Sequence, residues 1–217
     1  MAYTLNSTGI TFNDGTTQST TSADRGKPIS ITYYTSGTNT YTVPAGCTKL
    51  FIQLQGGGGG SAGYCESGGA GGYAEGIYSV TPGATYTVTI GGGGGSVGYY
   101  AAAGAGGSTS FGSLISATGG YGANNNYSHG GGIGGLGASG QVNLYGGSGA
   151  GHGNSANHAQ PSGGGAGFFG GPGSKTRSND GANFGPSWGT GASGGITDIG
   201  SAGAVGTGGI CVIFAYT

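Results

Sequence analysis

Three histidines, His129, His152 and His158, are the residues in this chain best suited to hold a metal ion. Neutral imidazole binds Zn²⁺ and Ni²⁺ well, and His152 and His158 are close together in a segment that shows no strand or helix pattern. However, no cysteine or carboxylate accompanies the histidines at the spacing of a metal site. The sequence therefore predicts no metal centre, and no motif in it predicts a cofactor.

Patterns typical of enzymes occur here only as often as chance allows in a glycine-rich chain. The serine-hydrolase pattern G-x-S-x-G occurs at 59–63, 94–98, 185–189 and 191–195, but none of these follows a strand and opens a helix. The glycine runs match dinucleotide-binding loops just as trivially, again without a following helix. The carboxylates are scattered and form no pair suited to glycoside hydrolysis: Asp14, Asp24, Glu66, Glu75, Asp180 and Asp198. We therefore expect that the protein is not an enzyme.

Charged residues make up only 5% of the chain, and its formal net charge is -1. A nucleic-acid-binding surface needs a basic patch, and attraction to anionic lipid needs clustered Lys or Arg; neither pattern occurs. There is also no apolar run long enough to span a membrane, and the first residues lack the basic and apolar regions of a secretory signal. We expect no nucleic-acid partner, no membrane insertion and no export by a signal peptide.

The elements that must position any site are β-strands. Strand-like patterns occupy 29–34, 40–43, 48–55, 73–80, 84–90 and 209–216. The segment 48–55 alternates, with Leu50, Ile52 and Leu54 on one face, which is typical of a strand with one buried face. No segment has helical periodicity of useful length. The sequence therefore predicts an all-β chain in which 29–55, 73–90 and 209–217 form a small β-sandwich.

Two smaller features accompany this sandwich. Residues 1–28 are polar and contain the turn signal Asn13-Asp14-Gly15, which predicts a short attachment arm or hairpin. The cysteines Cys47, Cys65 and Cys211 are odd in number and do not suggest a disulfide framework. Cys47 and Cys211 lie in or beside strand-like segments, so we interpret them as buried free thiols.

Glycine supplies 60 of the 217 residues, and all but five of these lie between positions 56 and 209. Ordering so much glycine costs conformational entropy, which polyproline-II-type helices offset by hydrogen bonding one another at close range. We therefore predict a large inserted polyglycine-II helix bundle, mainly in 91–208. The alternative, a set of flexible glycine-rich loops, fits less well with the interleaved aromatic residues and with the return of the chain to strand 209–216.

The turns between the glycine runs are rich in Tyr, Asn, Ser, His and Trp. These residue types, apart from His, dominate adaptable recognition loops, and a rigid scaffold that presents variable loops is a common form of binding site. Another interpretation is that Phe168, Phe169 and Trp188 cap the bundle or pack between its layers. The candidate recognition residues are Tyr99, Tyr100, Asn124, Asn125, Tyr127, His129, His152, Asn154, His158 and Trp188.

Three motifs stand out at the borders of the glycine-rich stretch: TYTVPAGCTKLFIQLQGGGGG at 40–60, SVTPGATYTVTIGGG at 79–93 and GGICVIF at 208–214. These motifs resemble the glycine-rich domains of phage tail fibre proteins. Together they span about residues 38–217. The glycine block also resembles the polyglycine-II tips of phage adhesins, in which loops between the rods bind outer-membrane proteins or surface glycans. The segment 8–20 is similar to short segments of phage structural proteins, including those of cyanophages.

This resemblance implies a receptor-binding protein of the virion tail that is assembled in the host cytoplasm. Its partners would be a host cell-surface protein or glycan and, through residues 1–28, other tail proteins. It would form a homotrimer, or a monomer that caps a fibre. Because better-known adhesins cap a separate long fibre, the short arm here would suit direct attachment to a virion. The alternative function is a structural virion protein, either a capsid decoration or a tail assembly component, that binds no receptor.

Overall fold

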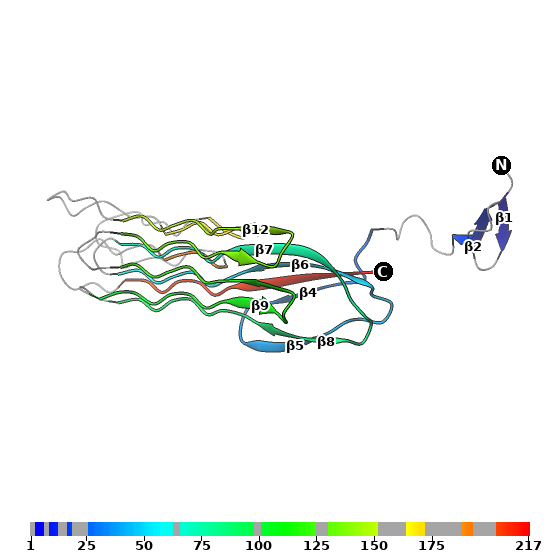
Figure 1. The fold of residues 1–217 in the computed structure, drawn as a ribbon, viewed down its shortest axis with the longest axis horizontal. Helices are drawn as coiled ribbons and strands as arrows, with labels where there is room; N and C mark the ends of the chain where they lie inside the picture. The colour runs from blue at the N-terminus through cyan, green and yellow to red at the C-terminus, as the bar shows by residue number, and fades with distance from the viewer. Residues whose placement is uncertain are drawn as a thin grey trace.

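The computed structural model is elongated, with β-strands at one end that continue into a bundle of glycine-rich segments (Figure 1). No helix occurs among the residues that the structure describes, so this part of the chain offers no helical membrane span. The expectation of an all-β protein is confirmed. The described residues are 3–6, 9–12, 17–18, 26–62, 66–97, 101–124, 130–151, 164–171, 188–192 and 203–217.

Two antiparallel sheets of five strands each pack face to face as a β-sandwich. In the first sheet the strand order is β11 (Gly137–Ala138), β10 (Ile115–Ala117), β9 (Thr109–Phe111), β8 (Thr85–Thr89) and β5 (Thr38–Thr42). In the second sheet the strand order is β12 (Val142–Leu144), β7 (Tyr73–Ser79), β6 (Lys49–Gln55), β13 (Ile210–Tyr216) and β4 (Ser30–Tyr34).

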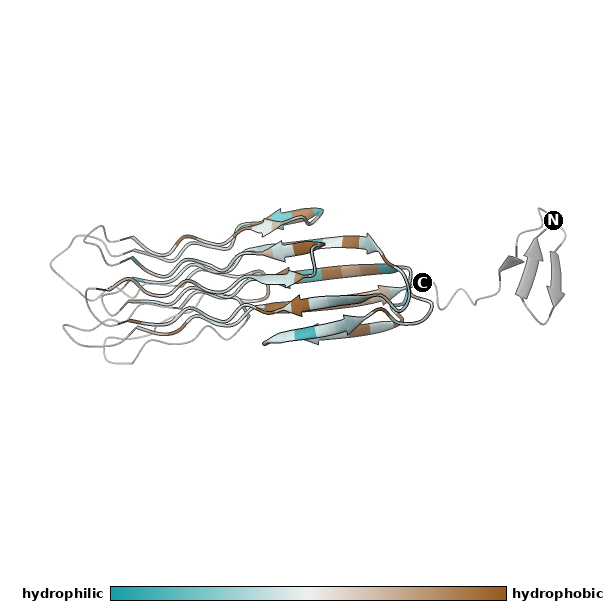
Figure 2. Cartoon of the chain, turned by 60° about the horizontal axis from the view of Figure 1, so that its bottom comes forward, coloured by the Kyte–Doolittle hydropathy of each residue, from teal (hydrophilic) through white to brown (hydrophobic). Residues whose placement is uncertain are grey.

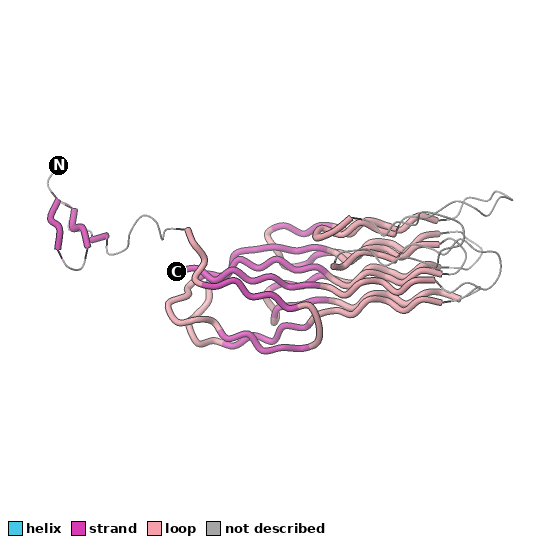
Figure 3. The backbone as a smooth tube through the Cα atoms, turned by 180° about the vertical axis from the view of Figure 1, so that it is seen from behind, coloured by secondary structure: helices cyan, strands magenta, loops and turns pink. Residues whose placement is uncertain are grey.

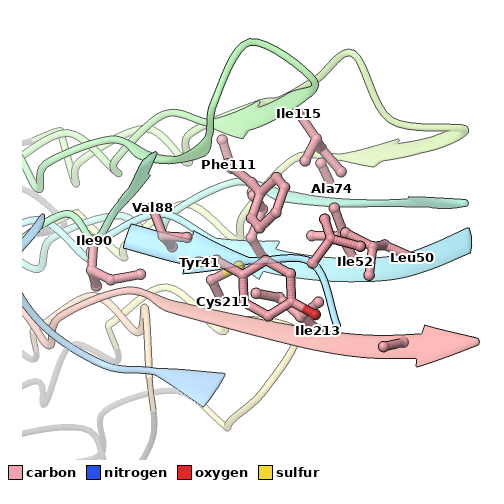
Figure 4. Close-up of a cluster of buried hydrophobic side chains, with 14 of the residues drawn as sticks. Tyr41, Leu50, Ile52, Ala74, Val88, Ile90, Phe111, Ile115, Cys211 and Ile213 are labelled. Carbon is pink, nitrogen blue, oxygen red and sulfur yellow. The ribbon is translucent and has the colours of Figure 1, made fainter. Parts of the chain in front are cut away.

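The core between the sheets follows from the alternation of side chains along each strand. On β6, Leu50, Ile52 and Leu54 are fully buried, whereas the intervening residues are half-buried. They join one apolar cluster with Val88 of β8 and Phe111 of β9, which belong to the opposite sheet (Figure 4). The predicted orientation of β6 is therefore confirmed.

Strand β13 completes the second sheet, as the sequence predicts, and it does so from an interior position between β6 and β4. Ile213 of β13 pairs with Ile52 of β6 on one side and with Thr32 of β4 on the other. Strands β9 to β12, however, come from within 91–208, the stretch that the sequence assigns to the glycine-rich insertion. The bounds predicted for the sandwich are therefore incomplete, because strands of two or three residues are too short to show alternation.

A separate small sheet precedes the sandwich. It consists of β1 (Tyr3–Asn6), β2 (Gly9–Phe12) and β3 (Thr17–Gln18), paired antiparallel in that order. Strands β2 and β3 flank the turn signal at 13–15, so the hairpin expected there is confirmed.

Glycine-rich segments continue from the sandwich strands and run beside one another (Figure 3). Backbone hydrogen bonds join each to its neighbours, and the whole set is called the glycine block below. Most of its residues belong to no regular strand or helix. The segments are 56–62, 66–72, 91–97, 101–108, 118–124, 130–136, 145–151, 164–171, 188–192 and 203–209.

The hydrogen bonds within the block repeat every third residue. Along 56–62, successive N–H groups donate in rotation to three different segments, so that each neighbour is reached once in three positions. Toward segment 66–72, the donors Gly56, Gly59 and Ala62 reach the carbonyls of Gly72, Gly69 and Glu66. A chain with this pattern presents its backbone groups in three directions, unlike a β-strand, which presents them in two.

Two segments lie at the centre of the block. Segment 56–62 donates to 66–72, 101–108 and 203–209, and it accepts from 91–97, 118–124 and 188–192. Segment 66–72 donates to 118–124, 145–151 and 188–192, and it accepts from 56–62, 130–136 and 164–171. Among the described residues, each of these two segments is therefore bonded to neighbours on all sides, and the remaining segments form the rim around them.

Close approach of the backbones explains why the block is built of glycine. A Cβ atom added to Gly58, Gly59 or Gly60 would overlap the main-chain carbonyl group of a neighbouring segment. The block therefore buries backbone rather than apolar side chains, and its residues are mostly pale on the hydropathy scale of Figure 2. Strongly hydrophobic residues gather in the sandwich strands instead.

This geometry predicts opposite outcomes for two Gly→Ala substitutions. In Gly58→Ala the new methyl group would collide with the carbonyl of Thr190, whereas a Cβ at Gly92 meets nothing within 4 Å. We expect Gly58→Ala to lower the free energy of unfolding by about 1–3 kcal/mol. We expect Gly92→Ala to be neutral or to stabilise by up to about 1 kcal/mol, because alanine restricts the unfolded chain. Urea unfolding of both variants measures the difference, and equal destabilisation would contradict the close packing.

Candidate functional site

One end of the glycine block lies away from the sandwich (Figure 1). Short backbone contacts hold its segment ends together. The N–H of Ala62 donates to the carbonyl of Glu66 at 3.1 Å, and the N–H of Val97 donates to Ser61 at 3.3 Å. We call this the distal end and define it by the segment ends at Ala62, Glu66, Val97, Asn124, Gly130 and Gly203.

The distal end receives one of the candidate recognition residues that the structure describes. Asn124 is exposed, and its N–H lies 3.5 Å from the carbonyl of Gly130 across the stretch 125–129. Trp188 is 41% exposed but lies at the other end, because the adjacent Gly189 donates to Gly208 beside strand β13. The structure therefore does not bring Asn124 and Trp188 together. The other candidates lie outside the described residues: Tyr99, Tyr100, Asn125, Tyr127, His129, His152, Asn154 and His158.

Two exposed apolar side chains lie on the rim of the block, midway along their segments. Tyr121 is 62% exposed and Ile133 is 65% exposed, and the N–H of Tyr121 donates to the carbonyl of Ile133 at 2.8 Å. Ile133 and Leu136 lie three positions apart, and both are exposed. Tyr121 was not among the predicted recognition residues. Its place on the rim follows from the three-residue period, which only the hydrogen bonds reveal.

Gln55 is the last residue of β6 and lies at the sandwich end of the block, where its side chain contacts three glycine-rich segments. Its side chain is fully buried, and its Nε2 donates to the carbonyls of Gly71 at 3.3 Å and Gly189 at 3.4 Å. Its Oε1 accepts the N–H of Phe169 at 3.1 Å. All three contacts serve the packing of the block, so Gln55 has a positioning role.

An aromatic cluster covers the same junction. The ring of Phe168 stacks on Tyr73 with centroids 3.7 Å apart, and Phe169 meets both rings edge-on. The hydroxyl of Tyr73 donates to Glu75 at 2.6 Å, and burial together with the neighbouring carboxylate raises the pKa of Tyr73. The interpretation that Phe168 and Phe169 pack at the bundle is therefore confirmed.

Glu66 is the one charged residue in the described part of the glycine block, and it is buried. Its side chain is 1% exposed, and neither carboxylate oxygen has a hydrogen-bond partner. Burial disfavours the charged form of a carboxyl group, and it raises the pKa of Glu66 to about 7. The sequence offered no signal for this residue, which stood among scattered carboxylates.

The described residues offer little other chemistry. They contain no group of three His, Cys, Asp or Glu side chains placed to hold a metal ion. Cys47 and Cys211 are buried free thiols, as expected, and burial raises the pKa of Cys211 to about 12. A thiol with so high a pKa is a poor nucleophile at neutral pH. Cys65 lies outside the described residues.

The raised pKa of Glu66 predicts a specific pH dependence of stability. Folding favours the protonated carboxyl, so stability falls as the pH rises from about 4.5, the unfolded value, through about 7, the folded value. In buffer treated with a chelator, we expect Glu66→Gln to be several °C more stable than the wild type at pH 8 and little different at pH 4.5. Thermal unfolding of both proteins at each pH measures this, and a constant difference between the two would contradict the assignment.

Comparison with known proteins identifies a family for this chain. No curated protein matches the chain. The family described as "Glycine-rich domain" matches residues 34–212, which include all the sandwich strands from β5 to β12 and every segment of the glycine block. The chain therefore belongs to the glycine-rich domain family.

Proposed function

We propose that the protein is a phage tail fibre adhesin whose glycine block presents recognition loops to the host cell surface. The observation that carries this proposal is the backbone network that gathers the segment ends at Ala62, Val97 and Asn124 at one end, away from the sandwich. A scaffold of this kind holds loops at fixed positions whatever their sequences are. The three motifs that resemble tail fibre domains supply the biological context.

We further infer that the glycine-rich segments are polyglycine-II helices. Helices of this class have about three residues per turn and no internal hydrogen bonds, so all their backbone groups are free to bond neighbours. The three-residue period along 56–62, and its bonding to segments on all sides, fit that form. So does the overlap that a Cβ at Gly58 would create, because only glycine permits such close contact.

The sequences that connect the segment ends at the distal end support a recognition role. The stretches 98–100, 125–129 and 152–163 carry Tyr, Asn, Ser and His. Tyrosine supplies large contact area at low entropic cost, and Ser and Asn supply adaptable hydrogen bonds. The target would be a host surface protein or glycan, and the exposed Asn124 at the distal end would lie near the contact. The proposal assigns no enzymatic activity to these residues.

The sandwich and residues 1–28 would attach the adhesin to the virion. Ile31, Tyr33 and Ile77 form exposed apolar positions on the sandwich, and surfaces of this kind often contact other protein chains. We propose that attachment involves other tail proteins and a homotrimeric assembly. Mass photometry of the purified protein measures the oligomeric state independently of receptor binding.

Substitution of one distal stretch tests the recognition role. We expect Tyr127→Ala combined with His129→Ala to reduce adsorption of virions to a susceptible strain by tenfold or more, without a change in unfolding temperature. Tyr145→Ala is the matched control, because it removes an exposed tyrosine that directly follows strand β12, away from the distal end, and it is expected to leave adsorption unchanged. Normal adsorption by the double variant would exclude the stretch 125–129 from receptor binding.

The position of the protein in the virion separates adhesin from structural component. Electron microscopy of virions labelled with an antibody against the glycine block is expected to place the label at the far end of the tail. A label distributed over the capsid lattice would instead support a decoration protein and overturn the proposed function.

A further inference from the structure

Glu66 is an anomaly in the physical chemistry of the fold. Its carboxyl group is 1% exposed and has no hydrogen-bond partner for either oxygen. Burying a polar group without a partner is unfavourable, and burying an isolated charge is more so. Such groups in folded proteins call for an explanation, of which a bound ion is one. None of the recognition residues discussed above accounts for it.

The three-residue period shows which neighbouring segment the Glu66 side chain faces. Glu66, Gly69 and Gly72 are spaced by three, so they share one edge of their segment. A Cβ at Gly69 would meet the carbonyl of Ile133, and one at Gly72 would meet the backbone of Leu136. Stepping back by three residues along both segments brings Glu66 opposite position 130, where segment 130–136 begins. Glu66 therefore has room for a side chain because the close packing of the two segments ends there.

Among the described residues, the surroundings of this position offer oxygen atoms and no basic side chain. No Lys, Arg or His occurs among the described residues of the glycine block, and Glu66 is the one formally charged residue there. The neighbouring segment ends supply peptide carbonyls, including that of Gly130, and Asn124 supplies an exposed amide beside it. A carboxylate with carbonyl and amide oxygens is the ligand set of hard cations, above all Ca²⁺, which accepts six to eight oxygen ligands in flexible geometry.

We propose that the distal end of the glycine block holds a hard metal cation, best matched by Ca²⁺, with the Glu66 carboxylate as its charged ligand. Backbone carbonyls at the adjoining segment ends and the Asn124 amide complete the coordination. The cation neutralises the buried charge and ties segments 66–72 and 130–136 together at the distal end. This inference concerns the scaffold, and it stands whether or not the protein binds a receptor.

Metal-dependent unfolding of three proteins tests the site. The wild type, Glu66→Gln and the control Glu75→Gln are freed of metal with a chelator, transferred to pH 8, and heated in CaCl₂, MgCl₂, KCl or NaCl. We expect CaCl₂ at about a hundredfold excess over its Kd to raise the unfolding temperature of the wild type and of Glu75→Gln by about 5 °C or more. Glu66→Gln, which keeps the shape of the side chain, is expected to fold and to show no response.

Isothermal titration of the metal-free wild type with CaCl₂ provides a direct measurement that does not depend on any variant. One Ca²⁺ bound per chain supports the proposal, and its absence from Glu66→Gln assigns the ligand. A stronger response to KCl or NaCl than to CaCl₂ would overturn the assignment to Ca²⁺. No response to any cation, or an equal response in Glu66→Gln, would overturn the site itself and leave Glu66 as a buried neutral acid.

Discussion

The fold depends on main-chain hydrogen bonds between segments whose contact positions are mostly glycine. In an ordinary core, apolar side chains fill the space between backbones and supply the stabilisation. In the glycine block the backbones themselves make that contact, as the bonds from Gly57 to Gly107 and from Gly58 to Thr207 illustrate, each 2.9 Å long. A buried peptide group left unpaired is costly, so every segment needs its neighbours. The block is therefore cooperative in a way that a row of independent loops is not.

The sandwich supplies what the block lacks, which is a conventional apolar core. Its strands fix the spacing at which the glycine-rich segments start, and Phe111 and Ile213 anchor the two sheets against each other. Gln55 then transmits this order across the junction through its bonds to Gly71, Gly189 and Phe169. Because its amide both donates and accepts, a side chain of similar size with only one of these capacities would leave a buried group unpaired.

Much of the fold is legible in the sequence, but only where side chains carry the pattern. Alternation of Leu50, Ile52 and Leu54 indicates β6, and the apolar run at 210–216 indicates β13. The three-residue strands β9 and β10 leave no such trace. Within the block, glycine hides the three-residue period because it has no side chain to vary. For that reason the rim position of Tyr121 and the burial of Glu66 emerge only from the arrangement of the backbones. The position of Trp188 at the sandwich end depends on the route of the chain, which no local pattern encodes.

The position of β13 between β6 and β4 has a consequence for folding during synthesis. Strands β4 and β6 are synthesised early, yet they are not neighbours; residues 210–216 must lie between them. While the ribosome translates the glycine-rich stretches, the nascent chain therefore lacks the strand that completes its second sheet. Pairings between residues so far apart in sequence form slowly. The glycine-rich segments that are translated before β13 contain few large apolar residues, so an incomplete chain exposes little surface that favours aggregation. Their composition therefore suits the late pairing of β13 as well as the close packing of the block.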